Sequence, residues 1–254
     1  MRFGICTSID NIESLEKWGY DYLEANISKI AQMEEAQFQE AVKKVESSSI
    51  KVECFNILFP KTMYLLDPAS EWKPVNDYLH KAFDRMKRLS GEIVVFGSGK
   101  CRTIPSCMTF AEGHRKLVEV IRKTGEIAQQ YEITVVIEPL NTGETNSINC
   151  VAEGAITIAD VNLENVGLLA DSFHMFKENE NLRNITRVGK LWHTHVATVD
   201  GRRYPVQSDD LLEAFFKELK AINYDERMSI EGKTEDFEKD AIQALKVLKE
   251  LDSK

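Results

Sequence analysis

The sequence predicts an α/β protein built as a single TIM (β/α)₈ barrel over residues 1–254. Two observations predict this fold. Short apolar runs alternate with longer helical patterns from one end of the chain to the other, and such alternation implies a parallel sheet. In addition, polar residues end several successive apolar runs in the C-terminal half, where a barrel enzyme places its functional side chains. Eight strand-helix units fit a closed barrel better than an open, doubly wound sheet.

Short β-rich runs are predicted as the strands of the barrel. In chain order these are Phe3–Cys6, Tyr20–Ala25, Lys51–Asn56, Glu92–Gly97, Ile133–Glu138, Val166–Asp171, Lys190–Val196 and Arg227–Glu231. Between them, apolar residues recur every three or four positions, as in amphipathic helices. The predicted helices span Asn11–Trp18, 33–47, 73–90, 108–131, 151–160, 207–222 and 234–250, with a weaker pattern near Asn179–Val188. Ser208 and Thr234 are predicted to cap the last two long helices.

Composition limits the classes of function. A chain of 254 residues that is 43% hydrophobic can bury one large core. The start of the chain lacks a secretory apolar segment, and no window approaches the ~20 apolar residues of a membrane span, so we expect a cytoplasmic protein without a membrane partner. The five cysteines are scattered and are expected to be reduced. A net charge of −9 disfavours nucleic acid as a partner.

Potential metal ligands stand at the ends of four successive predicted strands, namely Glu138, Asp171, His195 and Glu231. An acid at the end of an apolar strand is costly to desolvate unless it is paired or bound to a metal. The strand ends of a barrel converge on one face, so these four side chains are predicted to surround one ion. His193 points to the same face of its strand as His195, but His195 lies nearer the C-terminal end. We therefore expect His193 to be a core residue that orients a neighbour.

The chemistry of this ligand set favours a divalent ion. Oxygen-rich ligands suit Mn²⁺, Mg²⁺ or Co²⁺ at least as well as Zn²⁺. Such an ion acts as a Lewis acid on a carbonyl and raises the acidity of the adjacent carbon. Glu138 and Glu231 are then suited to act as an acid/base pair, in which one removes a proton and the other returns it. His174, on the loop after Asp171, is predicted to form a hydrogen bond with the substrate, with a structural loop contact as the alternative.

Several segments resemble the motifs of the xylose isomerase-like TIM barrel superfamily, in particular its ketose 3-epimerase, hydroxypyruvate isomerase and inosose dehydratase branches. The clearest are IEPLNTGETN, DSFHM, HTHVATVDGRR and SIEGK, and earlier strands in KWGYDYLEAN, ECFNILFP and VVFGSG also resemble the family. The resemblance implies that Glu138, Asp171, His195 and Glu231 bind one divalent metal, commonly manganese, and that Glu138 and Glu231 are catalytic. It also implies that Glu144, His174 and an arginine near Arg202 hold substrate oxygens.

This sequence departs from the family pattern near the expected substrate. Thr142 stands where arginine is common, and Val206 follows Pro205 where glycine is usual. The loop from Ala197 to Arg203 is one residue longer than in the epimerases, which leaves Arg202 and Arg203 as alternatives for the substrate contact.

The function expected from these features is that of a metal-dependent sugar isomerase or epimerase, acting on a small ketose or related carbonyl sugar through an enediolate. An inosose-type dehydratase is an alternative, because the same proton abstraction can lead to loss of a hydroxyl group. A non-catalytic sugar-binding barrel is another. A DNA-repair endonuclease is disfavoured, since the early strand ends offer Glu24, Asn26, Asn56 and Gly97 instead of histidines. A sugar is the expected partner, and a homo-oligomer is left open.

The segment Gly97-Ser98-Gly99-Lys100 lacks the spacing of a nucleotide-binding loop. We predict a tight structural turn here. The alternative is a loop that approaches the ligand, with Lys100 or Arg102 contacting a ligand oxygen.

Overall fold

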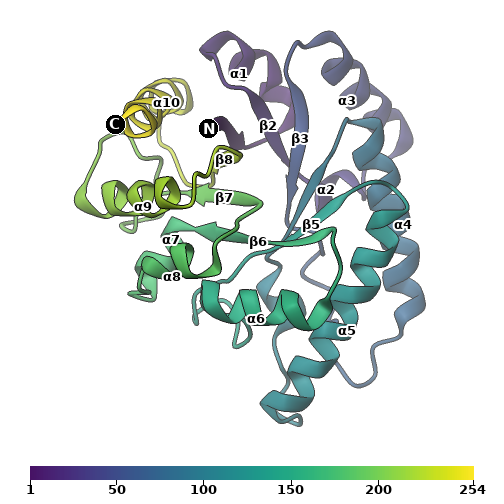
Figure 1. Ribbon diagram of the computed structural model, residues 1–254. Helices are drawn as coiled ribbons and strands as arrows, with labels where there is room; N and C mark the ends of the chain where they lie inside the picture. Colours follow the sequence, from purple (N-terminus) through teal and green to yellow (C-terminus); the bar gives the residue numbers. More distant parts are fainter.

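Eight parallel strands close on themselves in the computed structural model, which describes residues 1–254. They follow one another around the barrel in chain order, and β1 pairs with β8 to complete the ring (Figure 1). The predicted TIM barrel is therefore confirmed. The strands are β1 (Arg2–Cys6), β2 (Tyr22–Asn26), β3 (Lys51–Asn56), β4 (Ile93–Phe96), β5 (Thr134–Ile137), β6 (Val166–Asp171), β7 (His193–Val196) and β8 (Arg227–Ile230).

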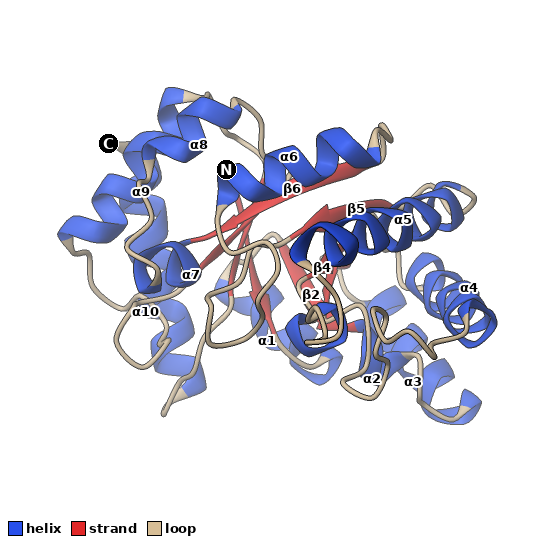
Figure 2. Cartoon of the chain, turned by 90° about the horizontal axis from the view of Figure 1, so that it is seen from below, coloured by secondary structure: helices blue, strands red, loops and turns tan.

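Helices surround the barrel, and in Figure 2 α5 and α6 run along the outside of the sheet beside β5 and β6. They are α1 (Ile12–Trp18), α2 (Ile27–Ile30), α3 (Glu35–Ser47), α4 (Trp72–Arg88), α5 (Phe110–Gln129), α6 (Val151–Val161), α7 (Ser172–Lys177), α8 (Arg183–Val188), α9 (Asp210–Ala221) and α10 (Phe237–Ser253). Two short 3₁₀ turns, η1 (Ile9–Asn11) and η2 (Gly99–Arg102), follow β1 and β4. None of the helices combines the length and the apolar character needed to cross a membrane.

Several predicted boundaries were wrong by two or more residues. The second strand begins at Tyr22 rather than Tyr20, because the Tyr20 backbone N–H bonds to the Leu15 carbonyl in the turn that ends α1. Gly19 makes this turn with a φ of 85°, a left-handed conformation that glycine adopts without a steric penalty. The seventh strand begins at His193 rather than Lys190.

The predicted caps of the last two helices were also wrong. Helix α9 is capped by Asp209, whose carboxylate accepts a hydrogen bond from the Leu212 backbone N–H at 2.8 Å. Helix α10 is capped by Asp236. Both segments contain several capping residue types in succession, and in each case the aspartate directly before the first helical residue provides the acceptor. Thr234 instead donates a hydrogen bond to the Asp240 carboxylate at 2.6 Å.

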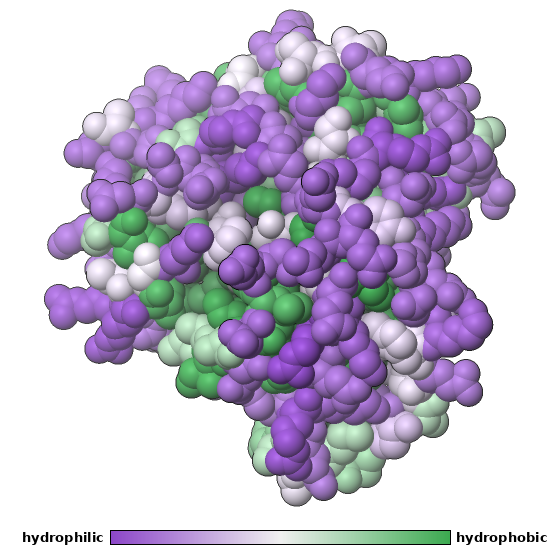
Figure 3. Space-filling model, turned by 45° about the vertical axis from the view of Figure 1, so that its right-hand side comes forward, coloured by the Kyte–Doolittle hydropathy of each residue, from purple (hydrophilic) through white to green (hydrophobic).

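Most of the apolar core lies between the strands and the helices. A smaller cluster fills the barrel interior, since its members alternate along the strands with residues of the larger core; it includes Tyr22, Val136 and Leu169. Two residues further along the same strands, on the same face, stand acids: Glu24, Glu138 and Asp171. The two-residue period of the strands therefore places these carboxylates directly above this cluster. On the side of the molecule seen in Figure 3, hydrophilic residues predominate and hydrophobic ones gather toward the middle and lower left.

Candidate active site

Four side chains predicted as metal ligands meet at the C-terminal ends of β5 to β8. Glu138, Asp171, His195 and Glu231 each offer one ligand atom, and these atoms all lie within 4.8 Å of one another. His195 Nδ1 is 3.2 Å from Glu138 Oε1 and 3.2 Å from Glu231 Oε2. The side chains of Glu138, Asp171 and His195 are almost fully buried. Residues far apart in the sequence are thus brought together as a compact, oxygen-rich group.

The two glutamates of this group are held in different electrostatic environments. Burial raises the pKa of Glu138, and the nearby charge of Glu231 raises it further. Burial also acts to raise the pKa of Glu231, but the positive charges of His195 and Arg202 outweigh it and lower this pKa. A pair of carboxyl groups whose pKa values are shifted in opposite directions is suited to donate and accept protons in one reaction.

Arg202 lies over the carboxylate group. Its Nη2 donates to Asp171 Oδ2 at 3.0 Å and also to Glu231 Oε2, and its guanidinium stacks 4.7 Å from the centre of the Phe173 ring. Arg203 instead forms an ion pair with Glu235 on the surface, at 2.9 Å. The structure therefore separates the two arginines that the sequence left as alternatives: Arg202 faces the candidate site, and Arg203 does not.

His174 and Glu144 line the same cavity as Glu138, Arg202 and Glu231, and this cavity has a volume of about 380 Å³. The backbone N–H of Asn141 donates to His174 Nδ1 at 3.1 Å. In the neutral ring the proton must therefore be on Nε2. That nitrogen is buried and has no hydrogen-bond partner, although Asp171 Oδ2 lies 3.5 Å away. His174 thus presents an unused hydrogen-bond donor.

Glu144 is connected to this site by a hydrogen bond from Asn141. The side-chain amide of Asn141 donates to Glu144 Oε1 at 3.0 Å, and Arg202 Nη1 lies 4.0 Å from the same oxygen. A second cavity of about 560 Å³ adjoins the first, and Ile57 and Glu231 line both. Glu231 is therefore accessible from two sides.

Arg102 has a structural role, as expected for a tight turn after β4. It is fully buried and donates hydrogen bonds to the carbonyl oxygens of Gly97 (2.7 Å), Ser147 (2.5 Å) and Glu138 (2.7 Å). Gly97 is required by close approach, because a Cβ at this position would overlap Glu138 Oε2. Arg102 thus holds the backbone of Glu138 at the end of β5, and Gly97 leaves room for its side chain. Lys100, the other proposed ligand contact, lines the cavity.

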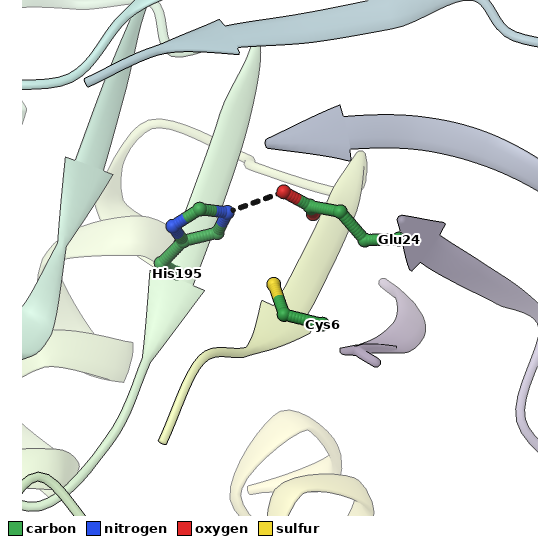
Figure 4. Close-up of side chains that lie close together, drawn as sticks. All are labelled: Cys6, Glu24 and His195. Carbon is green, nitrogen blue, oxygen red and sulfur yellow. Dashed lines mark hydrogen bonds and ion pairs between the residues drawn. The ribbon is translucent and has the colours of Figure 1, made fainter. Parts of the chain in front are cut away.

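Glu24 is the buried acid that the sequence analysis did not assign to the site. Its side chain on β2 is 0% exposed and accepts hydrogen bonds from two histidines, His195 Nε2 at 3.0 Å and His193 Nε2 at 2.7 Å. Burial opposes ionisation of Glu24, but the charges of His195 and His193 lower its pKa. Figure 4 shows Glu24 facing His195, with Cys6 of β1 pointing toward the space between them. The available signal was an acid within the apolar run of β2, two residues beyond interior Tyr22.

Comparison with known proteins places the chain in a family. Residues 12–251 match the model of the xylose isomerase-like TIM barrel, and the chain belongs to this family. The 3-dehydro-D-guloside 4-epimerase of Escherichia coli (strain K12) is 32% identical over 126 residues, which cover 48% of this chain and 47% of that enzyme. The L-ribulose 3-epimerase of Methylomonas sp. (strain DH-1) is 26% identical over 215 residues, 81% of this chain and 71% of that enzyme. The chain spans about half the length of the first of these relatives.

Solved structures share the fold over the full length of the chain. A crystal structure of D-psicose 3-epimerase in the presence of D-fructose has a TM-score of 0.87 at 21% identity and covers 100% of both chains. The IOLI protein with a binding zinc atom has a TM-score of 0.80 at 20% identity and covers 100% of this chain and 98% of its own.

Proposed function

We propose that this protein is a divalent-metal-dependent sugar isomerase or epimerase, which interconverts small ketoses or related carbonyl sugars by proton transfer through an enediolate. The observation that carries the proposal is the convergence of Glu138, Asp171, His195 and Glu231 within 4.8 Å beside a cavity of about 380 Å³. The E. coli and Methylomonas relatives are both sugar epimerases, which supports the same class of substrate and reaction.

The residues fit a divalent ion held by Glu138, Asp171, His195 and Glu231. Three carboxylates and one imidazole each offer a ligand atom within 4.8 Å of the others, and this oxygen-rich donor set suits a divalent cation. Mn²⁺ is the proposed metal, with Mg²⁺, Co²⁺ and Zn²⁺ as alternatives, and the zinc atom in the IOLI protein supports a divalent ion. When bound, the ion would polarise the substrate carbonyl and raise the acidity of the adjacent carbon.

Glu138 and Glu231 are the proposed acid/base pair. One glutamate takes the proton from the carbon beside the carbonyl, and the resulting enediolate then receives a proton from the other glutamate. In the reverse direction the two exchange roles. The opposite directions of their pKa shifts support this division, because one group favours the protonated form and the other the carboxylate.

His174, Glu144 and Arg202 are proposed to hold substrate oxygens. The unpartnered Nε2–H of His174 is a donor directed at a buried polar site, and such a donor is stabilised when a substrate oxygen accepts from it. Arg202 bonds to two of the proposed metal ligands, Asp171 and Glu231. A metal cation would compete with Arg202 for those carboxylates and so favour contact between its guanidinium and the substrate.

The remaining parts of the proposal concern the whole protein. We infer one barrel domain over residues 1–254, a cytoplasmic location and no nucleic-acid or membrane partner. Light scattering of the purified protein determines whether it forms a homo-oligomer.

The proposal is tested by proton NMR of a ketose and keto-sugar panel in D₂O with the protein. The metal is supplied as Mn²⁺ for turnover and removed before the spectra are recorded. We expect at least one sugar to gain deuterium at the carbon beside its carbonyl, together with a new epimer or isomer of unchanged covalent connectivity, and we expect chelation to abolish the reaction. A product lighter by one water molecule would indicate the dehydratase. Binding of a sugar without any exchange would favour the non-catalytic barrel and contradict the proposal.

A further inference from the structure

A buried carboxylate, that of Glu24, contacts the Nε2 side of the proposed metal ligand His195. Glu24 comes from β2, on the opposite side of His195 from the cavity-lining carboxylates, and it has no lysine or arginine among its hydrogen-bond or ion-pair partners. Both of its oxygens are used by imidazole rings. A carboxylate that is fully removed from solvent must obtain its stabilisation from such bonds, so this arrangement is specific rather than incidental.

An imidazole that binds a metal ion is neutral, and the contacts of His195 determine which nitrogen then keeps the proton. Nε2 is 3.0 Å from Glu24 Oε1, whereas Nδ1 is 3.2 Å from both Glu138 Oε1 and Glu231 Oε2. A proton on Nε2 gives Glu24 a hydrogen bond and leaves the Nδ1 lone pair directed at the proposed metal position. The other neutral tautomer would place a lone pair against the Glu24 carboxylate and a proton where the ion belongs. Glu24 therefore favours the tautomer that can bind metal through Nδ1.

His193 holds Glu24 in this position. Its Nε2 lies 2.7 Å from Glu24 Oε2, and its Nδ1 lies 3.1 Å from the carbonyl oxygen of Arg227. These two contacts, one on each ring nitrogen, fix the orientation of the His193 ring. The rings of His193 and His195 pack edge to face with their centres 5.0 Å apart. Rotation of Glu24 away from His195 would break its buried contacts with both imidazole rings.

We propose that Glu24 is a positioning residue for the metal site, which fixes the ring orientation and the Nε2-protonated tautomer of His195 through a hydrogen bond that His193 secures from the other side. The inference rests on the metal site of the proposed function but not on the reaction that this site performs.

The test compares metal binding by wild type, Glu24→Gln and Tyr22→Phe. Tyr22→Phe is the matched control, since it removes a buried hydrogen bond from the same strand, the 2.8 Å contact with Ser229, without touching His195. Isothermal titration calorimetry with Mn²⁺ and with Zn²⁺ gives the dissociation constants. We expect Glu24→Gln to weaken metal binding by roughly 10- to 100-fold, as loss of a carboxylate partner of a metal-bound histidine typically does, while Tyr22→Phe binds metal as wild type does. Equal dissociation constants for Glu24→Gln and wild type would overturn the inference.

NMR of the wild-type protein tests the tautomer of His195 directly, and it does not depend on whether Glu24→Gln folds. Long-range ¹H–¹⁵N NMR of wild-type protein labelled at histidine, loaded with diamagnetic Zn²⁺, reports the protonation of each ring nitrogen. The inference requires His195 to carry its proton on Nε2 and to bind zinc through Nδ1; zinc on Nε2 would contradict it. Cys6 and Glu24 also lie within 4.8 Å of a His195 ligand atom, so a second ion per chain whose binding is lost in Glu24→Gln would make Glu24 a ligand and overturn its positioning role. Absence of any metal binding by wild type would instead refute the proposed function.

Discussion

Replacing Gly97 with alanine is expected to lower turnover by about 100-fold while the barrel stays folded. A Cβ built at this position would overlap Glu138 Oε2 and would lie 3.3 Å from Glu138 Cδ. The carboxylate must then retreat by about 1 Å to reach an ordinary non-bonded separation. Gly97 does not have a positive φ, so alanine can adopt its backbone conformation and the effect falls on Glu138.

The assay for Gly97→Ala is steady-state turnover of the best substrate, measured with saturating metal alongside thermal unfolding. Gly189→Ala is a suitable control, because Gly189 has a φ of 74° and no neighbour within 4 Å of a built Cβ. That substitution strains the backbone at a site remote from Glu138 and should lower the melting temperature without loss of turnover. Wild-type turnover by Gly97→Ala would refute the conclusion that the exact position of the Glu138 carboxylate limits the reaction.

Three further predictions follow from other contacts. Asp171→Asn should weaken metal binding and reduce the rise in melting temperature that metal produces in wild type; an unchanged rise would show that Asp171 is not a ligand. Arg202→Ala should raise KM for the sugar with the metal still bound, and an unchanged KM would remove Arg202 from the substrate site. Burial opposes ionisation of Glu53, but hydrogen bonds from Arg2 and Arg227 lower its pKa. The ionised Glu53 therefore stabilises the folded protein at neutral pH, and this contribution is lost as the pH falls through the folded-state pKa. Glu53→Gln should therefore reduce the free energy of unfolding by about 2 kcal/mol at pH 7 and by much less in acid, as urea titrations at both pH values would show; a loss independent of pH would contradict this origin.

The sequence was sufficient to predict the barrel because its strand periodicity and its alternation with helices are properties of short segments. The convergence of Glu138, Asp171, His195 and Glu231 followed from one further rule, that parallel strands of a closed barrel end on the same face. Here the structure has the expected geometry, although their roles as ligands remain a proposal.

Other features depend on contacts that no local pattern encodes. Glu24 was not assigned because an acid in an apolar strand is compatible with any buried partner, and its partners His193 and His195 are supplied by β7 across the barrel. The choice between Arg202 and Arg203 depends on the backbone of one loop, in which Arg202 adopts a φ of 51°. This left-handed conformation is uncommon for a residue with a long side chain and is not apparent from the sequence.

The most direct test of the proposed acid/base pair is solvent deuterium exchange into substrate by Glu138→Gln and Glu231→Gln, with metal occupancy confirmed for both. Each variant keeps one oxygen that can bind the metal but loses the basic carboxylate. We expect turnover to fall by roughly 10²–10⁴-fold in each, and the two variants to lose exchange with opposite members of an epimer pair. Full exchange by both variants with both epimers would show that the proton-transfer groups lie elsewhere and would contradict the mechanism.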